Sequence, residues 1–211
     1  VRSFNGVSRV VIEEVEGLAF SAQGVLLSTQ GTNQTATRTN QLVAGVPLVG
    51  SGGAEYNVRT NAIAQRFKAR VPSGATSWSL TGVSLWLDRD GLTDSQGAVQ
   101  IWSDNNGEPG SMLAQRTFLE LSLAGTPTKE TFALSLSGLD PNSAYWIVVR
   151  ATFLLSPCGV LESGELVASD HESLARWSSS TSKWTTSSDS SLVYEVRGDV
   201  AITQPTATIE S

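Results

Sequence analysis

Few residues in this chain of 211 could carry out chemistry. One histidine, His171, lies between Asp170 and Glu172, with Ser169 and Ser173 on either side. A catalytic triad needs its nucleophile, base and acid to converge in space, and adjacency along the chain does not provide that convergence. We therefore interpret His171 as a solvated loop residue and predict that the protein is not an enzyme.

Metal and sulfur chemistry are similarly limited. A single histidine and a single cysteine cannot form a Cys/His metal cluster, and Cys158 has no second cysteine for an intrachain disulfide. We interpret Cys158 as a buried small residue, with an intermolecular link or a reactive thiol as the alternatives.

Calcium is the one metal for which the chain offers ligands. The candidate calcium ligands are Asp88, Asp90, Asp94 and Asp104. The position twelfth from Asp88 is Val99 rather than the bidentate Glu of a helix-loop-helix site. Turn chemistry is the simpler interpretation of these segments, so we expect no cofactor and keep calcium as the alternative.

Tryptophans are the stronger candidates for binding. If Leu85 and Leu87 face a core, Trp86 points the other way, and the same alternation turns Trp102 outward beside Gln100. We expect these two tryptophans, on neighbouring strands, to form an apolar patch that the N-terminal arm or a partner chain covers, with a glycan as the alternative.

A second pair, Trp177 and Trp184, flanks the Ser/Thr-rich segment Ser178–Ser182. We expect the two rings to pack across a hairpin, with stacking on sugar rings as the alternative. The candidates for partner or glycan binding are therefore Trp86, Trp102, Gln100, Trp177 and Trp184.

The elements that must position these residues are short strands. Apolar and polar residues alternate in Val83–Leu87, Val99–Trp102 and Phe132–Leu136, and turn residues separate such runs. The pattern predicts an all-β fold, an antiparallel β-sandwich or jelly roll with an N-terminal strand-and-arm extension. Strands are expected at 63–70, 79–88, 97–103, 113–121, 129–136, 144–153, 160–168, 174–178 and 191–197, with a possible helical turn at 119–123.

The alternation also predicts the core and a division of the chain. One core should contain Leu85, Ile101, Phe132, Leu134, Ile147 and Tyr194. Residues 1–61 form an N-terminal extension or assembly arm, in which Val7–Glu16 and Leu18–Ser28 suggest two strands joined at Gly17 and 30–40 is a polar run without periodicity. Residues 62–198 form the sandwich domain, and residues 199–211 form a C-terminal tail of a strand and a linker.

Composition limits the partners. The net charge of −6 and the lack of a basic run disfavour nucleic acid and anionic membranes. The chain begins at Val1 without a targeting segment. We expect that either a signal peptide or an initiator methionine preceded it.

Five segments resemble a known family. They are Ala64–Phe67, Trp78–Leu87, Val99–Ala114, Leu139–Val149 and Tyr194–Gly198. In this order they are similar to the bacterial surface-protein domain called choice-of-anchor R, which carries an Ala-Gln-Ser-Phe strand, an aromatic-Ser-Asp-Asn-Gly-x-Pro-Gly turn and a Tyr-Trp strand. Arg66 stands where that family has Ser. The resemblance covers about 64–198, and it implies an exported β-sandwich without catalysis, similar to modules of phage fibres and decoration proteins.

The turn in this resemblance also follows from its residues. Asp104, Asn105 and Asn106 favour turn conformations, Gly107 allows positive φ, and Pro109 fixes a second turn.

Two functions compete at this point. The first is a non-enzymatic structural protein of a virion (a phage decoration, fibre or tail component) or of another extracellular assembly, whose partners are further copies of the chain or other proteins of the assembly. The alternative is a secreted bacterial carbohydrate-binding or adhesion module. Either function predicts a location at the virion surface or outside the cell.

Overall fold

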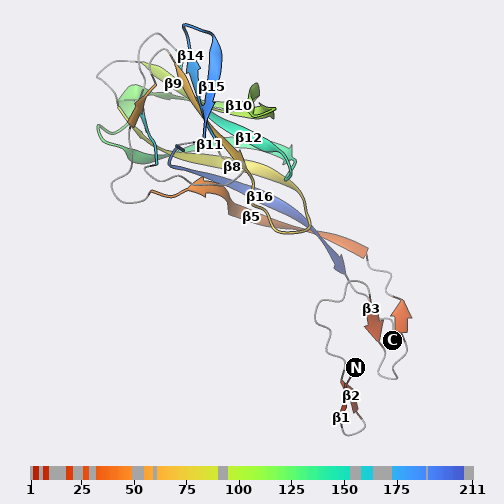
Figure 1. Cartoon of the computed structure of the whole chain (residues 1–211). Coiled ribbons are helices and arrows are strands. Elements are labelled where there is room, and N and C mark those ends of the chain that lie inside the picture. The colour runs from red at the N-terminus through yellow and green to blue at the C-terminus, as the bar shows by residue number, and fades with distance from the viewer. Residues whose placement is uncertain are drawn as a thin grey trace.

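The protein is an all-β sandwich. The computed structural model describes residues 2–4, 7–9, 18–20, 26–28, 32–48, 55–58, 61–89, 95–152, 158–163, 173–188 and 190–206. Two six-stranded antiparallel sheets pack face to face, as the alternating strands predict (Figure 1). The fold class inferred from the sequence is confirmed.

The first sheet, called here the β9 sheet, has the strand order β10-β9-β12-β7-β14-β15. Its strands are β7 (Ala62–Lys68), β9 (Gln96–Asn105), β10 (Glu108–Leu119), β12 (Ala144–Ala151), β14 (Leu174–Ser178) and β15 (Lys183–Ser187). A single 3-10 turn, η1 (Glu120–Ser122), follows β10 within the expected helical turn at 119–123.

The second sheet, called here the β8 sheet, has the order β5-β16-β8-β13-β6, and β11 also pairs with β8. Its strands are β5 (Thr32–Val46), β6 (Glu55–Asn57), β8 (Ala75–Asp88), β11 (Thr128–Leu139), β13 (Gly159–Leu161) and β16 (Tyr194–Thr206). The expected strands overlap β7 to β14 and β16, whereas β5, β6 and β15 were not expected as separate strands.

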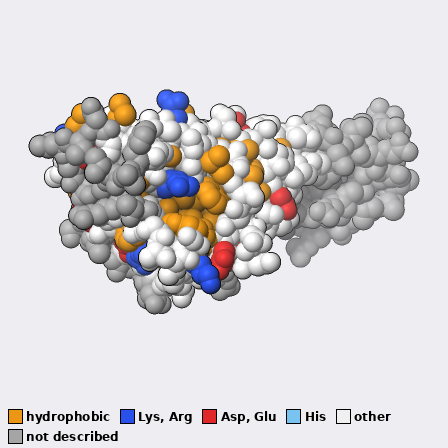
Figure 2. All heavy atoms as spheres, turned by 90° about the horizontal axis from the view of Figure 1, so that it is seen from above, with side chains coloured by type: hydrophobic (Ala, Val, Ile, Leu, Met, Phe, Trp, Pro, Cys, Tyr) orange, Lys and Arg blue, Asp and Glu red, His pale blue; other side chains and the backbone are white. Residues whose placement is uncertain are grey.

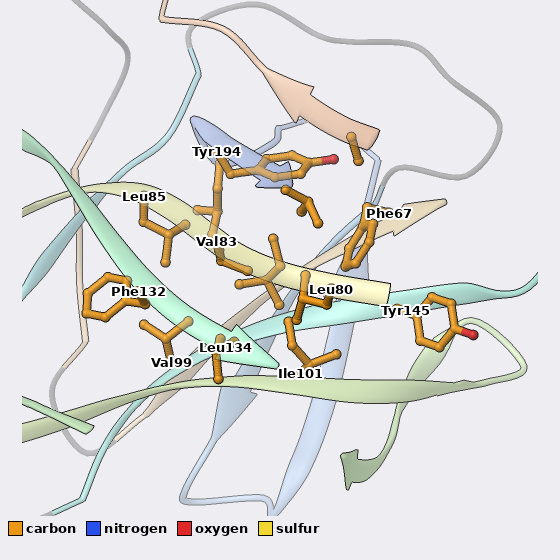
Figure 3. Packing of buried hydrophobic residues seen from close by; sticks show 14 of the residues in the cluster. Phe67, Leu80, Val83, Leu85, Val99, Ile101, Phe132, Leu134, Tyr145 and Tyr194 are labelled. Carbon is orange, nitrogen blue, oxygen red and sulfur yellow. The ribbon is translucent and has the colours of Figure 1, made fainter. Parts of the chain in front are cut away.

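The core lies between the two sheets and contains all six residues predicted for it. Figure 3 labels Leu85, Ile101, Phe132, Leu134 and Tyr194 among them. Ile101 pairs with Ile147 in the β9 sheet, and Leu85 pairs with Tyr194 in the β8 sheet. Each of these four side chains is 0% exposed. Phe67 contacts the rings of Trp78, Tyr145 and Tyr194, so aromatic rings from both sheets meet at the centre.

The Asn/Gly-rich turn joins β9 to β10, as its composition predicts. Asn106 has φ 54° and Gly107 has φ 90°, which are the two successive positive φ values of a tight hairpin turn. Asn and Gly tolerate this conformation better than other residues. The turn therefore sets the register in which Pro109 faces Asp104.

Strands from the expected N-terminal extension, residues 1–61, contribute to the core. The polar strand β5 pairs with β16 from Thr32 to Val46, and it adds Val43 and Val46 to the core. β6 pairs with β13, and the adjacent Val58 is fully buried. The segment lacks apolar periodicity because most of β5 faces solvent, with residues 35–42 exposed.

The described residues before β5 form two short hairpins. β1 (Arg2–Phe4) pairs with β2 (Val7–Arg9), and β3 (Leu18–Phe20) pairs with β4 (Leu26–Ser28). The interval 18–28 therefore contains a hairpin rather than one strand. In the described part of the chain, neither hairpin pairs with a six-stranded sheet.

The last strand crosses the expected boundary at residue 199. β16 continues to Thr206, which confirms a strand in the tail, and residues 207–211 lie outside the described part. β16 pairs with β8 only as far as Ile202, whereas it pairs with β5 as far as Thr206. The two strands therefore end in a two-stranded ribbon that projects from the sandwich, and the β1–β2 and β3–β4 hairpins lie beyond it (Figure 1).

Candidate functional site

The outer face of the β9 sheet carries a second, smaller apolar cluster. It contains Ala62, Ala64, Trp146, Val148 and Ala175, with Trp102, Trp177 and Trp184 packed against it. These residues alternate with core residues along β7, β9, β12 and β14, so their side chains leave the sheet on the side away from the core. Four of them, Ala62, Ala64, Val148 and Ala175, are small, which leaves space above the sheet.

Three tryptophan rings border that space. Trp177 and Trp184 face each other across the β14–β15 hairpin, with ring centroids 5.5 Å apart and an angle of 63° between the rings. Their expected cross-strand packing is therefore confirmed. Trp184 also contacts Trp102 of β9, at 6.4 Å and 78°. Trp184 is thus set edge to face against both neighbours, and the hairpin reaches back over the sheet toward β9.

A groove of about 380 Å³ lies among these rings. Ala62 and Val148 lie on the sheet beneath it, and Pro109 and Gly110, at the start of β10, line one side. The remaining lining residues are Asn61, Trp102, Arg150, Ala151, Trp177 and Trp184. We call this cavity the tryptophan groove. Its volume is in the range of small-ligand sites.

Figure 2 views the molecule from the side on which β14 and β15 lie in Figure 1. Hydrophobic side chains gather near the middle of this face, and basic side chains lie close to them (Figure 2). All three tryptophans of the groove are partly exposed. Their rings are therefore accessible to a ligand.

Two further hollows adjoin the tryptophan groove. Trp102 and Arg150 also line a hollow with Gln115, Met112 and Thr152, which we call the Gln115 hollow. On the other side, Trp177 and Trp184 also line a hollow with Glu108, Ser182 and Lys183, which we call the Lys183 hollow. Neighbouring spaces thus share lining residues: Trp102 and Arg150 on one side of the groove, and Trp177 and Trp184 on the other.

Gln100, a predicted contact residue, lines the Gln115 hollow and is hydrogen-bonded to Trp102. The indole Nε1–H of Trp102 donates a hydrogen bond of 2.8 Å to Gln100 Oε1. Gln100 Nε2 in turn donates one of 2.6 Å to Gln115 Oε1. Gln100 is 4% exposed and both ends of its amide are engaged, so it holds the ring of Trp102 in position.

Asp104 ties the β9–β10 turn to the sheet. Its carboxylate accepts hydrogen bonds from Arg66 Nε at 2.7 Å, Trp146 Nε1 at 2.8 Å and the Gly107 amide at 3.1 Å. Burial by itself would raise the pKa of Asp104, but these hydrogen bonds and the charge of Arg66 together lower the pKa below its ordinary value. Arg66, which stands where the choice-of-anchor R motif has Ser, therefore forms an ion pair with Asp104 beside the turn.

Trp86 does not join Trp102, so the expected two-tryptophan patch is wrong. Both rings point away from the core as predicted, but β8 and β9 belong to different sheets. Trp86 lies on the outside of the β8 sheet, where Lys129 Nζ is 5.2 Å from its ring centroid. The ring contacts are with Lys129 of β11 for Trp86 and with Trp184 of β15 for Trp102. Coverage by a partner chain stays a prediction.

The other candidate residues do not form a site in the described part of the chain. Asp104 is occupied by Arg66 and Trp146, and Asp88 is 7% exposed at the end of β8. Asp90, Asp94 and His171 lie outside the described residues. Among the residues that are described, no three His, Cys, Asp or Glu side chains gather where they could hold a metal. Cys158 is buried, as predicted.

Sequence reasoning missed Arg150, Pro109 and the small residues under the rings. Ile147 was expected in the core, which places Trp146, Val148 and Arg150 on the opposite side of β12. That alternation was available from the sequence. The closure of the groove was not, because it depends on where the β14–β15 hairpin lies.

Comparison with known proteins leaves the resemblance as it was. No protein-family model matches the chain, and no curated protein matches it significantly. The similarity to the choice-of-anchor R domain therefore stays a prediction that rests on its motifs. Within the described residues, no helix has the length and apolar character needed to cross a membrane.

Proposed function

We propose that this protein is a non-enzymatic binding module that holds a carbohydrate in the tryptophan groove. The observation that carries the proposal is the convergence of Trp102, Trp177 and Trp184 on one groove. Aromatic rings offer sugars an apolar stacking surface, while nearby polar groups fix the orientation of the ligand. This is the alternative function from the sequence, now with a specific site.

The surroundings of the rings support this proposal. Asn61 and Arg150 line the groove itself, Gln115 and Thr152 line one adjoining hollow, and Lys183 lines the other. These side chains can donate hydrogen bonds to hydroxyl groups. The mixture of partly exposed indoles with neutral and basic polar groups, and with Glu108 in the Lys183 hollow, suits stacking and orientation of a polar ligand.

The rigidity of the site gives further support. Gln100 holds Trp102, and the hairpin pairing holds Trp177 against Trp184. A preformed surface loses little conformational entropy when a ligand binds, which favours affinity. We therefore propose that the tryptophan groove is a binding site rather than a region of incomplete packing.

A glycan array probed with the full chain tests the proposal. Trp184→Ala should weaken binding by about tenfold or more, because a central tryptophan typically contributes about 2 kcal/mol. Trp86→Ala is the matched control, since it removes a partly exposed ring from the opposite sheet. Trp184→Phe retains an apolar ring in case the alanine variant is unstable. Equal affinity of the wild type and both Trp184 variants would contradict the proposal.

The projecting ribbon favours a second candidate function, in which the protein is a structural component of a virion or another extracellular assembly. β5 is the last strand of its sheet, and its residues 35–42 are exposed. Such an edge has open backbone groups that can pair with a strand of another subunit. In this function, the ribbon attaches the sandwich to the assembly while the sandwich stays on the outside.

The mass of the full chain in solution tests this second function. A stable oligomer that dissociates when residues 1–31 are removed would support attachment through the N-terminal hairpins. A monomer at all concentrations, with unchanged mass after the deletion, would contradict self-assembly through this region. A label introduced in place of Arg38, at the exposed edge of β5, would report whether this edge pairs with a strand of another subunit.

A further inference from the structure

Arg150 is a basic side chain without a partner in the groove. It is exposed at the end of β12, between Ala62 of β7 and Ala98 of β9 in the sheet register. Among the described residues, it takes part in no ion pair, hydrogen bond or cation–π contact. By contrast, Arg66 and Arg176 on the same sheet are both paired with carboxylates. The guanidinium of Arg150 is therefore available to a ligand.

The position of Arg150 is central rather than peripheral. Arg150 and Trp102 together line both the tryptophan groove and the Gln115 hollow. Among the described residues that line these two spaces, Arg150 alone carries a charge. A cation on the wall of a groove attracts an anion, because the low-dielectric walls focus its electrostatic field.

We propose that the ligand of the groove is an acidic saccharide chain, and that Arg150 binds one of its carboxylates. This inference rests on the proposed carbohydrate function. A planar guanidinium can donate two parallel hydrogen bonds to a carboxylate. This pairing selects a negatively charged sugar and also fixes its orientation. The partly exposed ring of Trp102 beside it provides the stacking surface.

The two hollows beside the tryptophan groove offer places for further sugar units, so we propose a saccharide chain rather than a single sugar. The tryptophan groove shares lining residues with the Gln115 hollow and with the Lys183 hollow. Trp102 and Arg150 stand at the first junction, and Trp177 and Trp184 stand at the second. Consecutive sugar units can therefore lie in consecutive hollows, with the carboxylate at the Arg150 junction.

The test compares matched probes on the full chain. The probes are oligosaccharides of uronic acids and their uncharged methyl esters, sialylated glycans and their desialylated forms, and sulfated glycans. The wild type should bind the carboxylated member of a pair about tenfold more tightly, which is the contribution of one charge-assisted pair. Arg150→Gln should remove this preference, so that the charged and the neutral member of a pair bind with similar affinity; its amide can still donate a hydrogen bond to a hydroxyl group. Arg150→Lys should recover only part of the preference because it loses the planar fork.

The matched control is Arg38→Gln, which removes the same charge from the exposed edge of β5. It should keep the preference for carboxylated probes. Equal affinity of the wild type for charged and neutral probes, or a preference that survives Arg150→Gln, would overturn the acidic specificity while the carbohydrate function stands. Binding of sulfated probes alone would overturn the carboxylate assignment. No binding to any class would overturn the inference and the proposed function together.

Discussion

The indole N–H of Trp102 is hydrogen-bonded, at 2.8 Å, to the side-chain oxygen of Gln100 two residues earlier on the same strand. The two side chains share one face of β9, so the bond runs along the strand. Gln100 is itself held by Gln115 of β10. The hydrogen bonds from Gln115 through Gln100 to Trp102 therefore fix the position of one tryptophan ring in the wall of the groove.

Replacing Gln100 by Leu should impair binding more than folding. Leu has a similar size, but it cannot accept the hydrogen bond of Trp102, so the ring becomes free to rotate. The lost hydrogen bonds should lower stability by only about 1 kcal/mol. Glycan affinity should fall several-fold, and titration calorimetry measures it. Gln100→Glu retains an acceptor and should keep most of the affinity; a Leu variant with wild-type affinity would argue against the positioning role.

Replacing Leu134 by Ala should destabilise the sandwich by about 2–5 kcal/mol, because the side chain is 4% exposed between the sheets. Urea denaturation followed by circular dichroism measures the change. Leu119→Ala is the control, since Leu119 is 52% exposed. This variant should stay within about 0.5 kcal/mol of the wild type. Similar effects at the two positions would contradict the assignment of Leu134 to the core.

Removing residues 1–61 should prevent cooperative folding, whereas removing residues 1–31 should leave the melting temperature nearly unchanged. The longer deletion takes away β5 and β6 with Val43, Val46 and Val58 of the core. The shorter one removes only hairpins that pair with neither six-stranded sheet among the described residues. Calorimetry of the two products distinguishes the cases. A stable fold without residues 1–61 would mean that these strands only cover a self-sufficient core.

Asp104 should make stability depend on pH in the acid range. Its folded-state pKa is lowered from the ordinary value of 3.8, so the unfolded chain takes up the proton first as the pH falls. The stabilisation is therefore complete above about pH 4 and is lost as the pH falls through the lowered pKa. Asp104→Asn should cost about 1–3 kcal/mol at neutral pH. The difference between the two proteins should shrink in acid; a difference that is constant down to about pH 2 would contradict the ion-pair role.

The sequence predicted the sandwich and its core well, for a physical reason. Burial on one face of a strand leaves a period of two, and Leu85, Ile101 and Tyr194 follow that period. β5 shows no such period, because it is an edge strand held to β16 by backbone hydrogen bonds, which do not depend on apolar side chains. Polar residues such as Thr37 are as suitable there as apolar ones.

The site was only half predictable from the sequence. Alternation showed which way Trp86 and Trp102 point, but not that consecutive strands enter different sheets. Cross-strand pairing of Trp177 with Trp184 is local and was foreseen. The contact of Trp184 with Trp102 joins segments about eighty residues apart, and local pattern carries no information about such contacts.

The β14–β15 hairpin forms the last two strands of the β9 sheet, and in the described part of the chain β15 pairs only with β14. A strand in that position opens more easily than the strands inside a sheet. A ligand that touches both Trp102 and Trp184 binds the closed hairpin and not the opened one. Ligand binding therefore raises the free energy of hairpin opening by RT ln(1 + [L]/Kd), where [L] is the free ligand concentration. The backbone amides of Lys183–Ser187 will consequently exchange with deuterium more slowly as the groove fills.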